Sequence, residues 1–455
     1  MGGRRGIAHH AATVLVGQLS VMAFGVTDTI VTGRHSEASL AALSIGSAVF
    51  VSVYVAVMGI FQALLPLWAE HHGADRPAAI GASVRQSLYL WVMACALGMG
   101  LLLTPDTILR ATDVPLALRG EVRTYLAILA FGLPPALLFR IYSTLSQAVN
   151  RPQFVTWLQM GSLLVKVPLS LWFTSGGAGL APQGAPGCAW ATLIVNYALL
   201  AVALMMLRRQ AVFQSLLLWR TWERPDWTEH KNFLRLGVPA ALSILVEVTS
   251  FTLMALFIAR QGALSAAAHQ IAANLAAVLY MVPLSLAISV SAHVSFSRGA
   301  GDEHQAARIA REGLLAAALL GCALAACLWT VKRPLADLYT TSPEVARLAT
   351  RLLSWVCAYH VADAVQTLCI FVLRSYRMTF TPLLVYGALL WGVGLGGGYA
   401  MAYGQWARAE PWWNSPLAFW GASTAALALT AMAFTVLLTV MLRASTARTQ
   451  GRLGG

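Results

Sequence analysis

The sequence predicts an all-α polytopic membrane protein, with twelve transmembrane helices in two pseudo-symmetric lobes of six helices each. The residues AVILMFWYC make up 58% of the 455 residues, and the 37 glycines raise the apolar share to about 66%, against roughly 45–50% in a soluble domain. Charged residues make up only 11%, where a soluble protein has roughly 25%. The apolar residues also fall in long blocks, and about 20 helical residues cross the hydrocarbon core of a membrane. These observations exclude a soluble globular protein.

The twelve expected spans follow from dividing the apolar blocks at charged, proline and glycine residues. In the first half they cover residues 8–33, 40–70, 78–104, 117–149, 152–174 and 186–208. In the second half they cover residues 232–259, 264–297, 307–331, 345–373, 380–403 and 416–443. We therefore expect an N-terminal lobe at 1–208, a cytoplasmic interfacial linker at 209–231, a C-terminal lobe at 232–443 and a cytoplasmic tail at 444–455.

The linker is the longest connection, and it mixes leucine and tryptophan with arginine. That mixture is typical of a helix lying at the membrane interface. A weak internal repeat supports the division into halves: at a constant offset of 226, Ile45 matches Ile271 and Tyr54 matches Tyr280. Because six spans is an even number, both halves enter the membrane in the same direction. A parallel repeat of this kind is typical of transporters with a central cavity.

The basic residues predict the orientation of the spans. The formal net charge is +13, but 28 of the 31 basic residues are arginines spread singly over many loops, so no nucleic-acid partner is expected. Nineteen basic residues fall on the side of the two termini and ten on the other side. By the positive-inside rule, both termini are cytoplasmic. We expect a monomer in the cell inner membrane, with the lipid bilayer as its partner.

Four ionisable residues lie well inside the expected spans: Asp28, Lys166, Glu247 and Asp363. A charge at the bilayer centre costs at least about 2.5–3.5 kcal/mol, so it needs a partner or a function. Glu247 and Asp363 fall in the second half, which has no Lys or Arg well inside a span. They therefore imply a bound cation or proton. The alternative is a structural hydrogen-bonded pair in which one acid is protonated.

Helical spacing adds oxygen ligands to these two acids. Tyr359, Asp363 and Gln366 lie on one stripe of the tenth span, and Gln270 and Asn274 form an i, i+4 pair on the eighth. Hard cations prefer oxygen ligands, so the set Glu247, Asp363, Tyr359, Gln270 and Asn274 predicts a cation site, with Glu247 and Asp363 as ligands of Na⁺. The number of oxygens favours Na⁺ over H⁺. The amide side chains can equally hold helices together.

The ordered motifs resemble those of the multidrug and toxic compound extrusion (MATE) family, NorM-like branch, over nearly the whole chain. They are Thr27-Asp28-Thr29 with Gly33, Leu236-Gly-Val-Pro239, Ala268-His-Gln-Ile271 with Pro283, and Leu373-Arg374-Ser-Tyr376. The resemblance implies a V-shaped pair of lobes and alternating access. It also implies export of amphipathic, often cationic, compounds against entry of Na⁺ or H⁺, with no other cofactor. The family's cation-site residues correspond to Glu247, Tyr359 and Asp363, with Asp28 as the carboxylate of the first lobe.

Lys166 departs from the family pattern, which has asparagines in the fifth span where this chain has Ser162 and Lys166. We expect Lys166 to pair with Asp28, which would leave the first lobe largely structural. The alternative is that Lys166 reaches a membrane interface.

The substrate cavity is expected to include Tyr54, Tyr280, Met281 and Phe251, because methionine and aromatic side chains form adaptable apolar walls. Packing against lipid explains such residues equally well. Two other functions stay open. A flippase for a lipid-linked glycan precursor would need an arginine-rich cavity, and Arg140 is the only arginine that is not assigned to one side of the membrane. A membrane-embedded enzyme is disfavoured because the sequence has neither H-E-x-x-H nor G-x-S-x-G, so we expect no catalytic residues.

Overall fold

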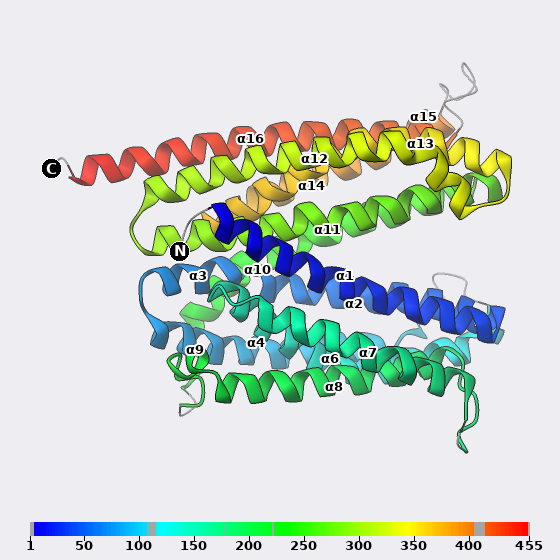
Figure 1. Ribbon diagram of the computed structural model, residues 1–455, viewed down its shortest axis with the longest axis horizontal. Coiled ribbons are helices and arrows are strands. Elements are labelled where there is room, and N and C mark those ends of the chain that lie inside the picture. The colour runs from blue at the N-terminus through cyan, green and yellow to red at the C-terminus, as the bar shows by residue number, and fades with distance from the viewer. Residues whose placement is uncertain are drawn as a thin grey trace. The chain divides into compact units, whose positions relative to one another are not determined.

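The computed structural model describes residues 4–106, 109, 115–177, 179–220, 223–404 and 415–453, with side chains as far as residue 447. Within these ranges the regular secondary structure is helical apart from one isolated β-bridge between Gly177 and Leu180 (Figure 1). The helices of the first half are α1 (Arg4–His35), α2 (Glu37–Gln62), α3 (Leu65–Gly73), α4 (Pro77–Leu103), α6 (Leu116–Ala148), α7 (Gln153–Ser175), α8 (Ala185–Arg209) and α9 (Ala211–Gln214). Those of the second half are α10 (Trp227–Ala259), α11 (Ala263–Gly299), α12 (Glu303–Tyr339), α13 (Pro343–Ser375), α14 (Phe380–Tyr386), the π-helix η1 (Gly387–Gly397), α15 (Gly398–Tyr403) and α16 (Pro416–Leu453).

Twelve helical segments in the described residues are long and apolar enough to cross a membrane, which confirms the predicted all-α, twelve-span class. Two of them join consecutive helices: α2 continues into α3, and α14 continues through η1 into α15. The second spans of the two halves, Glu37–Gly73 and Ala263–Gly299, are both 37 residues long. The repeat offset of 226 residues aligns Glu37, the first residue of one span, with Ala263, the first residue of the other.

The chain divides into two compact units. Thr13–Ala241 forms one, and the other joins the chain from Leu242 onwards to the start of α1, up to Ala12. In this second unit, Arg4 forms an ion pair of 3.1 Å with Glu312, and the Ser289 hydroxyl donates to the Ile7 carbonyl at 2.9 Å. The first turns of α1 are therefore held by α11 and α12.

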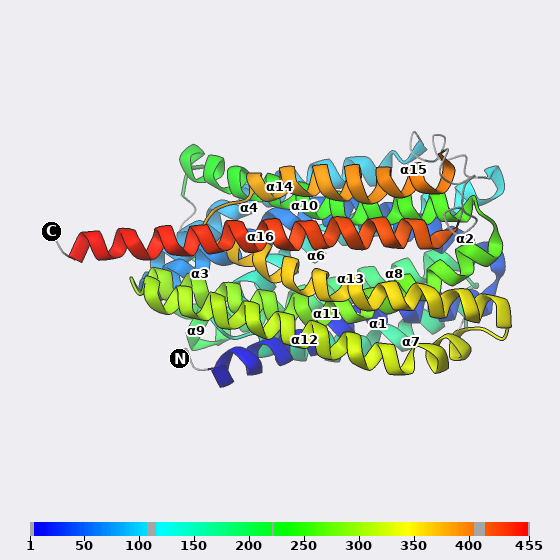
Figure 2. The ribbon, with the colours of Figure 1, turned by 90° about the horizontal axis from the view of Figure 1, so that it is seen from above.

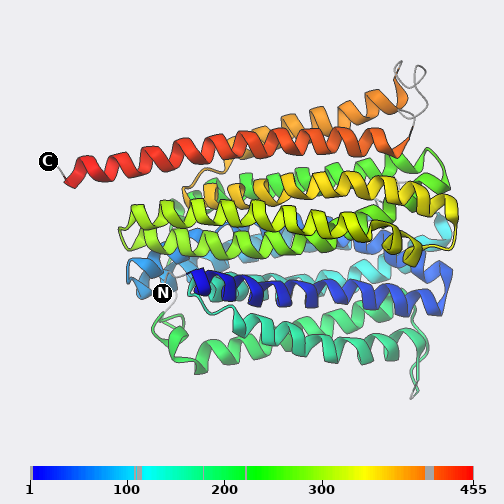
Figure 3. The ribbon, with the colours of Figure 1, turned by 45° about the horizontal axis from the view of Figure 1, so that its top comes forward.

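The fourth span of each half is the helix around which its unit packs. In the first unit α6 contacts α2, α4 and α8. In the second unit α13 contacts α11, α12 and α16, and these four helices lie side by side in Figures 2 and 3. A helix that is apolar on most sides becomes a central helix, and Leu352, Leu353 and Val356 of α13 are fully buried. The repeat in the sequence is thus matched by a repeat in packing.

The expected interfacial helix in the linker is largely absent. In residues 209–231, α9 covers only Ala211–Gln214, turns follow through Trp219, and α10 begins at Trp227. The sequence prediction of a helix was wrong here because side chains of α4 bind the linker backbone in a non-helical path, as described below. The linker belongs to the first unit.

Candidate functional site

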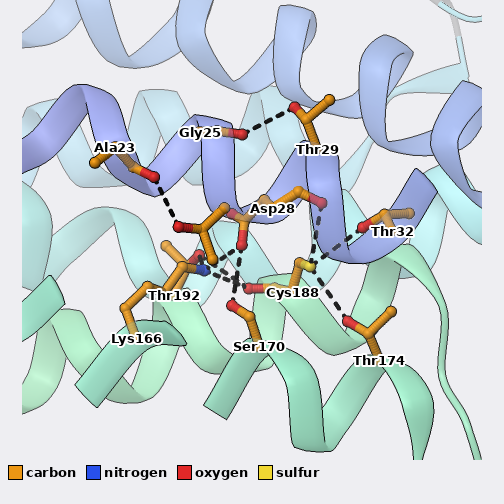
Figure 4. Close-up of polar contacts among 11 residues, drawn as sticks. Ala23, Gly25, Asp28, Thr29, Thr32, Lys166, Ser170, Thr174, Cys188 and Thr192 are labelled. Carbon is orange, nitrogen blue, oxygen red and sulfur yellow. Dashed lines mark hydrogen bonds and ion pairs between the residues drawn. The ribbon is translucent and has the colours of Figure 1, made fainter. Parts of the chain in front are cut away.

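The carboxylate of the first half is neutralised by an ion pair. The Lys166 ammonium of α7 lies 2.8 Å from the Asp28 carboxylate of α1, and this confirms the predicted pairing (Figure 4). The Lys166 side chain is 0% exposed and that of Asp28 is 13% exposed. Lys166 does not extend to a membrane interface, because its ammonium is held inside the unit.

The surroundings of this pair satisfy all of its donors. The Lys166 ammonium also donates to the Cys188 carbonyl at 3.0 Å and to the Thr192 hydroxyl at 2.6 Å, so its three hydrogens have three acceptors. The Ser170 hydroxyl donates to Asp28 at 3.0 Å. Ser170, Cys188 and Thr192 were missed by sequence reasoning. Ser170 alone had a signal, since it lies four residues after Lys166 on the same helix face.

The carboxylate of Asp363 in α13 is held by a chain of hydrogen bonds. The Gln366 amide donates to Asp363 at 2.9 Å and contacts the Thr367 hydroxyl at 3.0 Å. The Tyr386 hydroxyl of α14 donates to the Gln366 carbonyl oxygen. Asp363 is 4% exposed and Tyr386 is fully buried. Asp363 and Gln366 therefore lie together, as their spacing on α13 predicted. Tyr386 of α14 joins them, and no pattern in the sequence indicated this contact.

Glu247 of α10 is partly exposed and lies within electrostatic range of Asp363. Tyr280 of α11 and Tyr359 of α13 lie within range of both carboxylates. Among the described residues, neither acid forms an ion pair with a basic side chain within 4.0 Å. Two negative groups from different helices thus share one region of the second unit.

Arg374 also belongs to this region, and the expectation that no Arg lies beside the second-half acids was wrong. It is 5% exposed, and its guanidinium carbon lies 4.7 Å from the centre of the Phe371 ring. Its Nη1 atom is buried and has no hydrogen-bond partner among the described residues, and its charge lies within range of Glu247 and Tyr280. The sequence suggested a loop residue, but helical side chains lean toward the N-terminus, so the guanidinium reaches back one turn into the unit.

Gln270 and Asn274 of α11 bond to each other. The Gln270 amide donates to the Asn274 carbonyl oxygen at 3.2 Å, and both side chains are exposed. In the part of the chain that the structure describes, no hydrogen bond joins this pair to Glu247 or Asp363. The described residues also contain no group of three or more His, Cys, Asp and Glu side chains placed to hold a metal ion.

An aromatic cluster adjoins Tyr359. The Phe251 ring centre lies 6.3 Å from that of Tyr359 and 5.8 Å from that of Trp420. The Trp420 indole donates to His269 Nδ1 at 3.2 Å. Phe251 of the predicted cavity set therefore packs next to the predicted cation site. This arrangement combines aromatic faces and negative charge, which together attract organic cations.

The other predicted cavity residues are distributed over both units. Tyr280 and Met281 of α11 are partly buried in the second unit. Tyr54 of α2 belongs to the first unit, where its ring stacks on Phe50 at 6.0 Å and lies within electrostatic range of Arg140.

Comparison with known proteins identifies the family of the chain. The MatE family model matches residues 14–172 and 239–400. A probable multidrug resistance protein NorM of Aromatoleum aromaticum is 36% identical over 96% of this chain and 94% of its own length. Another, of Chromobacterium violaceum, is 32% identical over 88% of this chain and 87% of its own length.

Solved structures show the same fold. The Vibrio cholerae MATE transporter VcmN in the bent form has a TM-score of 0.83 at 17% identity, over 97% of this chain and 98% of that chain. A MATE transporter in an outward-facing conformation has a TM-score of 0.87 at 14% identity, over 97% of this chain and 96% of that chain. The chain therefore belongs to the MatE family, and it is a multi-pass membrane transporter rather than an enzyme.

Proposed function

We propose that this protein exports amphipathic organic cations and other drug-like molecules, by alternating access and in exchange for an inward cation, Na⁺ or H⁺. The names of its relatives, multidrug resistance proteins, support the substrate class. One observation carries the coupling. Asp28 is neutralised by Lys166 at 2.8 Å, whereas Glu247 and Asp363 share one region and neither has an ion-pair partner within 4.0 Å in the described chain. We therefore infer that the coupling cation binds in the second half, at Glu247 and Asp363.

The charges of this region limit how many cations move. Two carboxylates and the Arg374 guanidinium have a net charge of −1 when all three are ionised, so one Na⁺ or one proton neutralises them. A tenfold ion gradient is worth about 1.4 kcal/mol. Exchange of one Na⁺ for one monovalent drug cation moves no net charge, so a tenfold Na⁺ gradient sustains about a tenfold drug gradient.

Na⁺ is the favoured ion because several oxygens are available to it. Glu247 and Asp363 would supply carboxylate oxygens and Tyr359 a hydroxyl. Gln270 and Asn274 would add amide oxygens after their mutual hydrogen bond opens. A proton needs only one carboxylate, so the alternative ion uses Asp363 or Glu247 alone.

The moving parts in this proposal are the two six-helix lobes, residues 1–208 and 232–443, joined by the linker. The protein would act as a monomer in the cell inner membrane, with both termini in the cytoplasm, as the bias of its basic residues favours. The substrate would contact Phe251 and Tyr359, which are partly exposed and pack on the buried Trp420. The other proposed cavity residues are Tyr54, Tyr280 and Met281.

The test is an ion-jump experiment in inside-out vesicles. Vesicles are loaded with Na⁺ and diluted into Na⁺-free medium that contains a fluorescent organic cation, at constant pH and with the membrane potential clamped. We expect dye uptake only when Na⁺ is inside. Vesicles with Na⁺ on both sides and vesicles containing Asp363→Asn serve as controls. Uptake that ignores Na⁺ and follows a pH jump assigns the coupling to H⁺, and uptake that ignores both gradients refutes cation-coupled antiport.

A further inference from the structure

The linker between the two halves is fastened to one face of α4. The Leu216 carbonyl lies so close to Gly81 that a Cβ there would come within 1.8 Å of it. One turn later, the Arg85 guanidinium donates to the Leu217 carbonyl at 2.7 Å and forms an ion pair of 2.5 Å with Glu223. The Tyr89 hydroxyl donates to the Glu223 carbonyl at 2.8 Å. Residues at i, i+4 and i+8 of α4 thus hold the linker.

This attachment also fixes a strained backbone. Leu217 has a φ of +53°, in the left-handed region that is unfavourable for a non-glycine residue. The Arg85 guanidinium, which is buried, binds the carbonyl of that same residue. The linker is therefore held in a defined conformation against α4 and is part of the first unit.

Next to the linker lies a cavity of about 340 Å³ between α4, α6 and α8, and linker residues Leu218 and Trp219 line one side of it. Its lining is almost entirely apolar and includes Val92, Ile141 and Leu204. The lining residues come from the middle turns of α4, between Val84 and Val92, and from the last turns of α6 and α8. The cavity therefore lies toward the end of α8 that leads into α9, and Figure 1 shows where these helices lie. From Leu200 to Leu207 it follows α8 for about 10 Å.

The cavity opens on an apolar surface and carries positive charge at its mouth. Val92 is 57% exposed and Trp219 is 53% exposed, although both line the cavity. The Arg208 guanidinium lies 4.5 Å from the centre of the Trp219 ring and is itself exposed. Arg209 and Arg220 are exposed nearby in sequence. In a membrane, the exposed apolar residues along these helices contact lipid acyl chains, and the exposed arginines at the end of α8 lie at the level of the lipid headgroups.

We propose that this cavity binds one acyl chain of an anionic phospholipid, whose phosphate contacts Arg208. The apolar lining matches a hydrocarbon chain, and the guanidinium matches a phosphate. The positive-inside bias places this end of the helices at the cytoplasmic leaflet, whose anionic lipids attract basic residues beside membrane spans. Because its mouth is positive, the cavity repels organic cations. It is therefore separate from the transport pathway.

The experiment measures lipid binding by the purified, delipidated full-length protein with native mass spectrometry. The probes are a phosphatidylglycerol and a phosphatidylcholine with the same acyl chains. We expect one retained phosphatidylglycerol per protein, bound about fivefold more tightly than phosphatidylcholine. Arg208→Gln should remove this preference, while Arg209→Gln, on the same exposed end of α8, should preserve it.

A second pair of variants tests the cavity itself. Leu204→Trp places an indole in the lining, and we expect it to abolish the retained lipid. Met205→Trp, at the adjacent exposed position of α8 that does not line the cavity, should bind lipid as the parent does and controls for folding. Retention by Leu204→Trp, or equal binding of the two lipids, would overturn the proposal. Displacement of phosphatidylglycerol by a cationic dye would also overturn it, because the cavity would then be a drug site.

Discussion

Replacing Lys166 by methionine removes the one cation next to Asp28 while keeping a long apolar side chain. The change deletes an ion pair of 2.8 Å and two further hydrogen bonds, to Cys188 and Thr192. It leaves Asp28, which is 13% exposed, with the Ser170 hydroxyl as the remaining hydrogen-bond donor to its carboxylate among the residues drawn in Figure 4. Removing one partner of a buried ion pair costs roughly 3–5 kcal/mol.

The magnitude can be read as a change in apparent Tm. At roughly 2–4 °C per kcal/mol for a unit of this size, we expect Lys166→Met to lower the apparent Tm by about 6–20 °C. Asp28→Asn leaves an unpaired buried ammonium and should cost a similar amount. The double variant leaves no uncompensated charge, so it should recover at least half of the loss.

The assay is a thermal melt of the purified protein in one detergent at one scan rate, because membrane proteins often unfold irreversibly and their Tm then depends on the rate. Lys231→Met, at an exposed position in the first turns of α10, is the matched control and should change the Tm by less than about 2 °C. If the losses of Lys166→Met and Asp28→Asn simply add in the double variant, the two groups do not stabilise each other and the structural interpretation of this site is refuted.

Three further predictions concern the second half. Asp363→Asn and Glu247→Gln should each abolish dye efflux at normal surface expression, because each removes one of the two charges that we propose as ligands of the coupling ion. Tyr386→Phe should reduce transport less, since it removes one hydrogen bond to Gln366 worth roughly 0.5–1.5 kcal/mol; initial rates of dye uptake measure this. Arg374→Gln should raise the apparent affinity for the coupling cation, measured as the ion concentration for half-maximal transport, because the net charge of the region changes from −1 to −2.

Controls for these variants lie at exposed positions of the same chain. Glu344→Gln in the first turn of α13 should export dye normally, and so should Tyr339→Phe at the end of α12. Arg347→Gln on α13, which is exposed, should leave the ion dependence unchanged. Full export by Asp363→Asn would remove the second-half site from the mechanism. An unchanged or lower cation affinity in Arg374→Gln would show that this arginine does not offset the two acids.

The sequence by itself determined the twelve spans and the buried ion pair. Spans are readable because about 20 apolar residues must follow one another to cross the hydrocarbon core, and this requirement acts within a single helix. The pairing of Asp28 with Lys166 was predictable for a related reason. Two opposite charges well inside the spans of the same half each need a partner, and Lys166 stands where the family pattern has an uncharged side chain.

Only the tertiary structure decided which side chains from different helices meet. Arg374 resembles a loop residue in the sequence, and its place beside Glu247 depends on how α13 is rotated against α10 and α11. Tyr386 has no ionisable neighbour in sequence, yet the packing of α14 places its hydroxyl on Gln366. The linker has the composition of an interfacial helix, but Arg85 and Tyr89 bind its backbone in turns. Hydropathy and spacing report on one helix at a time, whereas these contacts depend on the rotation and register between helices, which side-chain packing sets.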